Sequence, residues 1–528
     1  MRETVVKLTG LDISVIVAFV VLLFGVAYWA SFVKKKKRGE SMFLAGKTLG
    51  WFSIGLTMWG TNVGPSVLVA SASSGFEGGI AAGNFSWYAF PFIFLLTFVF
   101  APRYLGAGIS TLPEFMGKRF GDRTRSYIAW YSIVTIVISW LGLTLFSGGV
   151  FMEQILGLPM WLCIVILVAV SAAFAVAGGL RAIAYTNVFQ MLLLIGVSAL
   201  LTAMAIYKVG GFTAIAEKTP PEYWNLFKPM SDADFPWLAI ILGYPIMGVW
   251  FWCTDQSMVQ SVLGAKNLRQ GQLGANFTAW LKLLDIPLFI LPGILCFLLT
   301  PNLTSSTDAY LNLVKAVFPI GLIGLVVVVM IAALVSTIGS ALNSLSAVFT
   351  MDIYAKRFKP GGQHDGEFNK VGRIVTLAGA VLSVFLAMAI TQIQGLSFFN
   401  IFQSVLGFIA PPMSAAFLFS VFWKRTTTRA VNLILTAGTV FSIGTGILYY
   451  TGVMLTGIHF LLISFGIFVA LSAAIALISL LAPEAAGQQT GADVAVAYKI
   501  KKPARAVLIP WIALIAVMVI MYIIFNGW

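Results

Sequence analysis

Three hydroxyl side chains lie near one another in a long apolar segment: Ser336, Thr337 and Ser340. On a helix, residues three or four positions apart are neighbours, so these hydroxyls are expected to lie close together. A hard cation such as sodium prefers oxygen ligands, and hydroxyls combined with carbonyls freed from a broken helix supply them without a buried carboxylate. Ser and Thr also pack membrane helices together, so the segment allows either a cation site or a packing interface.

A second candidate is the pair Lys282 and Asp285, three residues apart in an otherwise apolar segment and therefore on one face of a helix. An ionisable side chain inside a membrane is costly and usually faces a partner or a water-filled path. Two interpretations follow: Lys282 contacts a transported species, or the two residues form a structural ion pair. Asp255 is expected nearer the inner end of its helix, where a structural role is favoured.

The chain offers little for catalysis. Its two histidines, His364 and His459, are expected in a loop and at the end of an apolar segment. The sequence contains no Ser/His arrangement and no paired aspartates in facing segments, and no signalling domain is visible. An intramembrane enzyme or a sensor therefore stands only as an alternative of a different class.

The composition indicates which elements position these residues. Of the 528 residues, 59% are hydrophobic and only 10% are charged, and the mean hydropathy is +0.94. Soluble domains carry about 25% charged residues, so a water-soluble enzyme is nearly excluded. The apolar residues form long blocks, and runs of about 18 or more with few charges are typical of transmembrane helices.

Fourteen such blocks are expected to span a membrane. They fall at 11–31, 50–71, 80–101, 126–150, 158–178, 183–207, 237–263, 273–299, 318–355, 372–393, 399–422, 430–452, 457–481 and 506–526. Alternate loops are rich in Lys and Arg, as at 34–38 and 356–359, whereas the others are nearly uncharged, except for the mixed and slightly acidic loop at 208–236. Cytoplasmic loops carry such an excess, so both termini are expected outside. The same distribution assigns the net charge of +14 to a membrane topology, with lipid as partner and no nucleic acid.

Two blocks carry interruptions. The second contains Gly, Asn and Pro residues at 60–66 near its middle, and the seventh contains Gly and Pro at 243–248. Non-helical backbone at membrane depth is tolerated only where it is buried in protein or lines a cavity. Interrupted segments at matching places in two halves indicate a transporter with a binding site at the midplane, although packing kinks give a similar pattern.

Five motifs, in this order, resemble the solute:sodium symporter family and its sodium/glucose cotransporter branch, over roughly residues 11–450. They are FLAGKTLGWFSIGLTMWGTNVG at 43–64, GGLRAIAYTNVFQ at 178–190, FWCTDQSMVQSVLGAKN at 251–267, ALVSTIGSALNSLSAVFTMDIY at 333–354 and FQSVLGFIAPPMSAAFLFSVFWKR at 402–425. Any one of them could occur by chance in an apolar chain. Five in the right order are specific to the family.

The resemblance implies an all-α multi-pass membrane protein with a leucine-transporter-like fold of two inverted five-helix repeats. The repeats would cover 50–207 and 237–422. An extra helix and a basic loop (1–49) would precede them, an outer loop (208–236) would separate them, and further helices (423–528) would follow. The implied activity is sodium-coupled import of a small polar solute, a sugar or polyol, across the plasma membrane or a bacterial inner membrane. No cofactor is implied beyond sodium as the coupling ion.

The resemblance also implies site residues. Sodium would bind to the carbonyls of Gly60, Val63 and Ala333 and the hydroxyls of Ser336 and Thr337. The positions that contact sugar in the glucose branch correspond to Asn62, Trp252, Lys282 and Gln403, and the aromatic residue that covers the sugar corresponds to Phe251, where Tyr is usual.

Three departures put details in doubt. The glutamate that binds sugar hydroxyls in the glucose branch corresponds to Ser86, and a nearby polar residue corresponds to Val67. A neutral hydroxyl is a weaker acceptor than a carboxylate, so the pocket is expected to be less negative while Lys282 remains. A symporter for a sugar acid or another organic anion is therefore the alternative. Asn187 replaces an acidic residue of the family, which weakens the case for a second sodium site.

Overall fold

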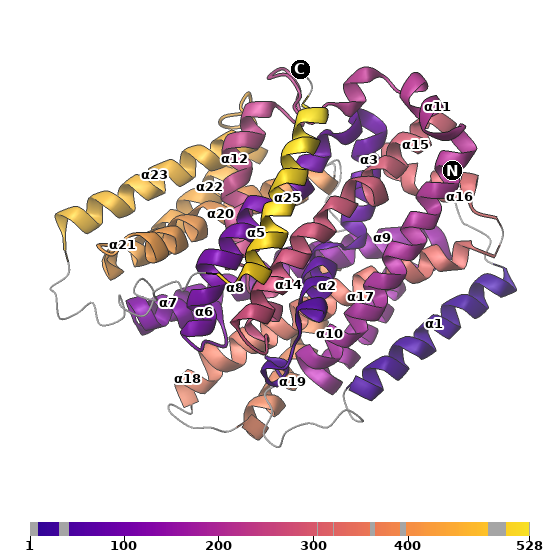
Figure 1. Ribbon diagram of the computed structural model, residues 1–528. Coiled ribbons are helices and arrows are strands. Elements are labelled where there is room, and N and C mark those ends of the chain that lie inside the picture. The colour runs from indigo at the N-terminus through magenta and orange to yellow at the C-terminus, as the bar shows by residue number, and fades with distance from the viewer. Residues whose placement is uncertain are drawn as a thin grey trace.

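The computed structural model of the chain describes residues 9–30, 42–303, 305–319, 321–358, 365–390, 398–483 and 503–526. Within these ranges the secondary structure is helical apart from two isolated bridges, Leu49 with Ala265 and Lys228 with Pro236. The helices pack side by side in one bundle (Figure 1).

The first half of the chain contains both long helices and short helices that follow one another closely. They are α1 (Gly10–Tyr28), α2 (Trp51–Asn62), α3 (Pro65–Gly78), α4 (Asn84–Trp87), α5 (Phe90–Leu95), α6 (Ala101–Gly106), α7 (Leu112–Phe120), α8 (Asp122–Thr135), α9 (Thr144–Leu156), α10 (Met160–Val209) and α11 (Gly211–Lys218). Short turns of different pitch connect several of them: η2 (Ala45–Lys47), η3 (Gly79–Gly83), η4 (Leu96–Phe100), η5 (Ile136–Leu143) and η6 (Pro221–Trp224).

The second half repeats this mixture of long and broken helices. Its helices are α12 (Trp237–Val249), α13 (Gln256–Leu263), α14 (Leu268–Leu281), α15 (Leu291–Leu299), α16 (Ala309–Val317), α17 (Ile323–Val348), α18 (Ala355–Phe358), α19 (Asp365–Ile390), α20 (Phe398–Phe422), α21 (Thr428–Leu433), α22 (Thr439–Tyr450), α23 (Phe460–Leu481) and α25 (Arg505–Ile524). Its connecting turns are η7 (Trp250–Thr254), η8 (Lys282–Leu284), η9 (Ile286–Ile290), η10 (Ser306–Asp308), η11 (Phe349–Tyr354) and η12 (Ile434–Gly438).

Twelve helical segments in the described ranges are long and apolar enough to cross a membrane, so the expected number of fourteen is not confirmed. The difference arises at two places. The 50-residue helix α10 covers two expected blocks, with non-helical backbone inside it at Gly179 (φ 57°, ψ −149°). The segment Val67–Gly106 joins the end of the second expected block to the third.

The first interruption lies where the sequence predicts it. Helix α2 ends at Asn62 and α3 begins at Pro65, and Val63 between them has a non-helical ψ of 81°. The second interruption was placed wrongly at 243–248, because α12 continues through Pro245 to Val249. The non-helical residue is Asp255 (φ −82°, ψ 129°), which caps α13.

The glycines of the seventh block have a packing role instead. A Cβ atom on Gly243 would lie 2.2 Å from the carbonyl oxygen of Leu461 on α23. A Cβ atom on Gly248 would lie 2.3 Å from the ring of Phe92 on α5. These glycines therefore allow close approach of neighbouring helices, which a sequence pattern does not distinguish from a break.

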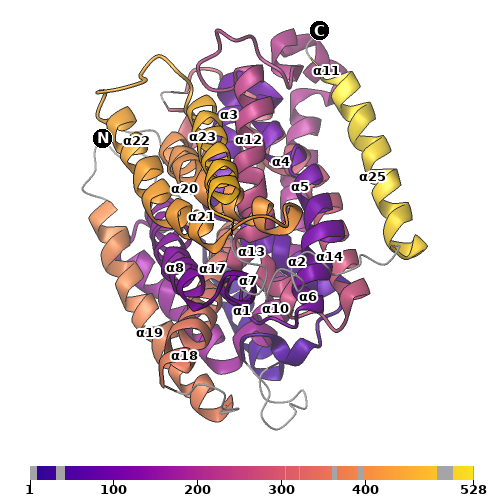
Figure 2. The ribbon, with the colours of Figure 1, turned by 90° about the vertical axis from the view of Figure 1, so that its left-hand side faces the viewer.

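Helix α17 lies at the centre of the bundle. The most apolar window of Ile323–Phe358 is 89% buried, whereas those of α1 and α25 are 22% buried each. Helix α17 packs against α10, α1, α19 and α2. Helix α1 lies at the edge of the molecule in Figure 1, and helix α25 lies at its edge in Figure 2. The hydroxyls of α17 are therefore held in the most enclosed part of the protein.

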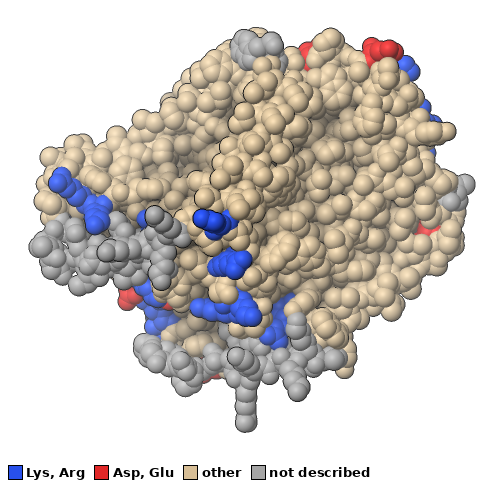
Figure 3. All heavy atoms as spheres, viewed as in Figure 1, with Lys and Arg blue, Asp and Glu red and all other residues tan. Residues whose placement is uncertain are grey.

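Charge is distributed unevenly over the surface. On the face seen in Figure 3, the described Lys and Arg side chains gather mainly toward the lower left, around α6, α7 and α18 of Figure 1. Much of the rest of this face carries uncharged side chains, as a lipid-facing surface requires.

Candidate functional site

A cavity of about 100 Å³ lies among the broken helices. All six side chains that the resemblance assigns to the solute line it: Asn62, Ser86, Phe251, Trp252, Lys282 and Gln403. They come from five elements spread over the chain, namely α2, α4, η7, η8 and α20. The structure therefore brings together residues that are up to 341 positions apart, from 62 to 403.

The cavity has further walls, of which the sequence indicated only Val67 and, as a sodium ligand, Thr337. They are formed by Gly64, Val67, Ala70, Ser71, Ala82, Phe85, Trp140, Thr144, Tyr244, Met247, Trp250, Thr337 and Leu406. The largest side chains among these further walls are the indoles of Trp140 and Trp250. Tryptophan is enriched at membrane interfaces. The position of Trp140 in the middle of the fourth apolar block, 126–150, is therefore unusual and could have indicated a cavity residue.

Aromatic rings form one side of the cavity. The ring centroid of Phe251 lies 5.4 Å from that of Trp140 and 5.0 Å from that of Trp252. The indole Nε1 of Trp140 donates to Oδ2 of Asp255 at 3.1 Å, and Asp255 also accepts from the backbone amides of Ser257 and Met258. Asp255 thus follows directly on the segment Trp237–Thr254, caps α13 at the second interruption and orients a cavity-lining tryptophan, which is the structural role that the sequence favours.

Lys282 is the centre of a polar cluster on another side of the cavity. Its Nζ donates to Oδ1 of Asn62 at 2.8 Å, to Oγ of Ser86 at 3.3 Å and to Oδ2 of Asp285. Nζ also lies 5.7 Å from the ring centroid of Trp252. Lys282 and Asp285 are both buried, so the structure combines the two interpretations of the sequence: the ion pair exists, and its lysine reaches the cavity.

The local backbone explains why this lysine reaches the cavity. Regular α14 ends at Leu281, and Lys282 begins the tighter turn η8, followed by the wider turn η9. Pro287 lies in the first turn of η9 and has no backbone N–H, so the regular hydrogen-bond pattern is interrupted there. Changes of helical pitch of this kind are frequent at functional sites.

The position of Ser86 is set by its neighbour in α4. Nδ2 of Asn84 donates to the carbonyl oxygens of Ala81 and Leu226, at 3.1 and 2.6 Å. Oδ1 of Asn84 accepts from the hydroxyl of Tyr522, on α25, at 3.2 Å. The short helix α4 is thereby tied to the 208–236 loop and to the C-terminal helix, which holds Ser86 against the cavity.

Three of the expected sodium ligands, Gly60, Ser336 and Thr337, lie close together at the first interruption. The backbone amide of Gly64 donates to the carbonyl of Asn62 and that of Val67 to the carbonyl of Gly64, at 3.1 and 3.0 Å. The carbonyls of Gly60 and Val63 are thus released from the amides that would bond them in a continuous helix. The hydroxyl of Thr337 donates to the carbonyl of Gly60 at 3.4 Å.

Ser336 completes this arrangement from α17. Its Oγ is buried and has no hydrogen-bond partner among the described residues, although a buried hydroxyl normally has one. Ala333 is buried one helical turn earlier on α17, and Val63 is the C-cap of α2. Neutral oxygens of this kind suit sodium, and the described residues contain no group of three or more His, Cys, Asp or Glu side chains that would hold a metal ion differently.

Replacement of Gly60 by alanine is expected to lower the affinity of the protein for sodium. The new Cβ atom would lie 2.8 Å from Met191 and 3.0 Å from Oγ of Ser336, so it intrudes on the expected ligands. Overpacking of this size costs about 1–3 kcal/mol. Uptake into proteoliposomes is expected to need several times more sodium for half-maximal rate.

The matched control for this prediction is Gly339→Ala, on α17. Its Cβ atom would lie 3.7 Å from Ile183, which is an ordinary contact. An equal loss of sodium affinity in both variants would contradict a local effect at Gly60.

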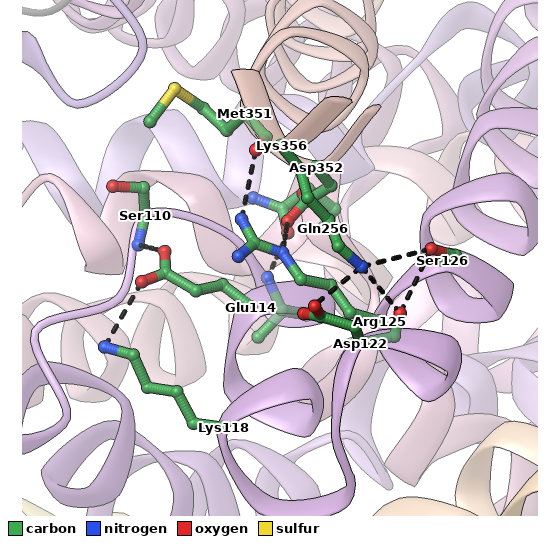
Figure 4. Close-up of polar contacts among 11 residues, drawn as sticks. Ser110, Glu114, Lys118, Asp122, Arg125, Ser126, Gln256, Met351, Asp352 and Lys356 are labelled. Atoms are coloured by element: carbon green, nitrogen blue, oxygen red, sulfur yellow. Dashed lines mark hydrogen bonds and ion pairs between the residues drawn. The ribbon is translucent and has the colours of Figure 1, made fainter. Parts of the chain in front are cut away.

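A second polar network lies at the ends of α7, α8, η11 and α18 (Figure 4). Arg125 donates to Oδ1 of Asp352 at 2.7 Å and to the carbonyl of Met351 at 3.0 Å. Lys356 pairs with Asp122 at 3.2 Å. These contacts tie the start of α8 to the end of the helix that carries Ser336 and Thr337, and so fix α17 at its basic end.

Gln256 extends the same region to the second interruption. Its side-chain oxygen accepts from the backbone amide of Leu112, the first residue of α7, at 2.8 Å. The residue directly after Asp255 is thus anchored to α7. This contact fixes the start of α13 and, with it, the position of the break.

A profile of the sodium:solute symporter family matches residues 42–431. The chain belongs to this family. Its membership identifies it as a membrane transporter and not an enzyme, and sodium is the ion that the family couples to solute movement.

Two relatives show how far the likeness extends. Sodium/glucose cotransporter 1 of sheep (Ovis aries) is 34% identical over 454 residues, which cover 78% of this chain and 68% of that protein. Sodium/glucose cotransporter 4 of zebrafish (Danio rerio) is 31% identical over 468 residues, which cover 82% of this chain and 71% of that protein.

Solved structures share the fold at lower identity. A Na⁺-coupled sialic acid symporter in a substrate-bound outward-open state aligns with a TM-score of 0.74 at 18% identity, over 90% of this chain and 99% of that chain. A nucleobase-cation-symport-1 family transporter in a closed conformation aligns with a TM-score of 0.53 at 13% identity, over 87% and 99% of the two chains. The predicted all-α multi-pass fold of the leucine-transporter type is confirmed.

Proposed function

We propose that the protein imports a small neutral polyhydroxylated solute, a sugar or a polyol, together with sodium by alternating access. The observation that carries this proposal is the contact between the two expected sites. Thr337 lines the solute cavity and donates to the carbonyl of Gly60. Asn62, which also lines the cavity, lies between Gly60 and Val63 in the sequence. Ion binding at the α2 break therefore acts directly on the wall of the solute cavity.

The chemistry of the walls supports a sugar-like solute. Hydroxyl, amide and ammonium groups face aromatic rings across the cavity, so a molecule with both hydrogen-bonding edges and an apolar face fits it. The names of the relatives, sodium/glucose cotransporters, agree with this chemistry.

A sugar acid is the second candidate. The ammonium of Lys282 at the cavity favours it, since an anionic solute gains most from a nearby cation. The structural neighbour described as a sialic acid symporter shares the fold with this chain.

Buried polar side chains without hydrogen-bond partners among the described residues support alternating access. Asn187 and Gln190 on α10, Asn343 on α17 and Ser261 on α13 are buried, with side-chain polar atoms that have no partner among the described residues. They lie on parts of α10, α13 and α17 that adjoin, along the chain, Arg181, Lys266 and the basic residues at 356–359. We assign them to a release path that is closed here and hydrated when the repeats, at 50–207 and 237–422, rock against each other. Both termini then face outward.

Uptake into proteoliposomes tests the proposal. A sodium gradient is imposed, and accumulation of labelled glucose, galactose, inositol, glucuronate and galacturonate is compared with gradients of potassium or choline. Sodium-dependent accumulation of at least one neutral member is expected. Uptake that is equal in sodium, potassium and choline would overturn sodium coupling, and accumulation of the acids alone would favour the second candidate.

A further inference from the structure

Asp285 is a buried carboxylate directly behind the cavity wall, with 1% of its surface exposed. Its Oδ1 accepts from the indole Nε1 of Trp59 at 2.9 Å. Its Oδ2 lies against both Nζ of Lys282 and Oγ of Ser86, the latter at 2.7 Å. Indole N–H and ammonium groups only donate hydrogen bonds, so Asp285 acts as an acceptor throughout.

This arrangement determines which way the hydroxyl of Ser86 points. A serine hydroxyl has one proton and two acceptor lone pairs, and here the proton is given to Asp285. Toward the cavity and toward Lys282, Ser86 therefore offers only lone pairs. A hydroxyl that donates to a carboxylate is also a stronger acceptor, because linked hydrogen bonds polarise one another.

The same carboxylate limits what Lys282 can offer to a solute. The three N–H groups of the ammonium are directed to Asn62, Ser86 and Asp285. No donor is left over for a solute carboxylate, and the positive charge is balanced by the negative charge next to it. The negative charge that is missing at Ser86 is thus supplied behind it by Asp285, 199 positions further along the chain.

We propose that Asp285 is the specificity-determining positioning residue of this cavity, which it makes selective for neutral polyhydroxylated solutes over their carboxylated analogues. It does so by neutralising Lys282 and by holding Ser86 as an acceptor for one solute hydroxyl. The proposal rests on sodium-driven solute import as the function, and it names the solute class.

The first test compares the wild-type protein with Asp285→Asn in proteoliposomes. Inhibition of uptake of the neutral panel solute is measured with glucose, galactose and inositol, and with glucuronate and galacturonate. The wild type is expected to prefer neutral solutes at least tenfold. Asp285→Asn is expected to shift the ratio at least tenfold toward the acids, because Lys282 is no longer balanced, while the sodium concentration for half-maximal uptake stays within twofold.

The matched control is Asp12→Asn. Asp12 is equally buried, but its carboxylate accepts from Thr9 and from the amide of Gly324 at the start of α17. Gly324 is 13 residues before Thr337 in the same helix, or about 20 Å at 1.5 Å per residue. Asp12→Asn is expected to leave the ratio between neutral and acidic solutes unchanged.

Ser86→Ala supplies a second test that does not depend on the folding of Asp285→Asn. Deoxy analogues of the transported solute, each lacking one hydroxyl, are used as inhibitors. One analogue is expected to bind at least tenfold more weakly than the parent in the wild type, and less than twofold more weakly in Ser86→Ala.

The outcomes separate the proposal from the function on which it rests. Lack of sodium-driven uptake of every panel solute refutes both. Uptake with a wild-type preference for acids refutes the role of Asp285 alone, as does an unaltered ratio in active Asp285→Asn. If Asp285→Asn does not fold, the role of Asp285 is refuted when the deoxy analogues inhibit Ser86→Ala with the same relative strengths as the wild type.

Discussion

Lys282→Ala is expected to reduce sodium-driven uptake at least about 100-fold and to lower the melting temperature of the protein. The substitution removes the donor that holds Asn62 and Ser86 in place at the cavity. It also leaves Asp285 buried without its counter-charge, and removing one partner of a buried ion pair costs about 3–5 kcal/mol. Uptake in proteoliposomes and thermal unfolding in detergent measure the two effects separately.

The double variant Lys282→Ala/Asp285→Ala distinguishes a functional lysine from a structural one. Removing both charges avoids an unpaired carboxylate, so the melting temperature is expected to recover most of its loss. Uptake is expected to stay low, because the cavity lacks the groups that orient Ser86 and Asn62. A double variant that transports nearly as well as the wild type would show that the pair serves only the fold.

Ser336→Ala is expected to raise the sodium concentration for half-maximal uptake by about tenfold, which corresponds to about 1.4 kcal/mol. The hydroxyl is buried without a partner in the described part of the chain, so its removal breaks no hydrogen bond there. The expected change is therefore confined to sodium binding, with the melting temperature in the absence of sodium nearly unaltered. Sodium titration of uptake and of thermal stability measures it.

Ser346→Ala is the control for this prediction. Ser346 is also buried on α17, but it donates to the carbonyl of Gly372 on α19 at 2.7 Å. Its removal is expected to reduce stability by about 1 kcal/mol without changing the sodium dependence. The sodium assignment fails if Ser336→Ala leaves the sodium titration unchanged, or if both variants shift it equally.

Family membership and the structure support different parts of the proposed function. Membership in the sodium:solute symporter family establishes the class of transporter, and likeness to solved structures establishes the fold. The choice between a neutral and an acidic solute depends on the charge next to Lys282. That charge belongs to Asp285, for which the sequence indicates only a structural pairing with the lysine.

Some features of this protein follow from the sequence alone, because their causes are local. Long apolar runs require membrane helices, since unpaired backbone groups are not tolerated in lipid. The first break is encoded by adjacent residues at 60–66, and the structure has it at Val63. Lys282 and Asp285 share a face because they are three residues apart, and they form an ion pair.

Other features were decided only by the tertiary structure. The second break lies at Asp255, because its carboxylate is bound by amides of α13 and by Trp140 from a distant helix, whereas Pro245 is accommodated within α12. The contact of Ser86 with Asp285 joins residues 199 positions apart. Such contacts depend on how helices pack in three dimensions, which short-range patterns do not encode, and it is this packing that brings Ser86 against the Lys282–Asp285 pair.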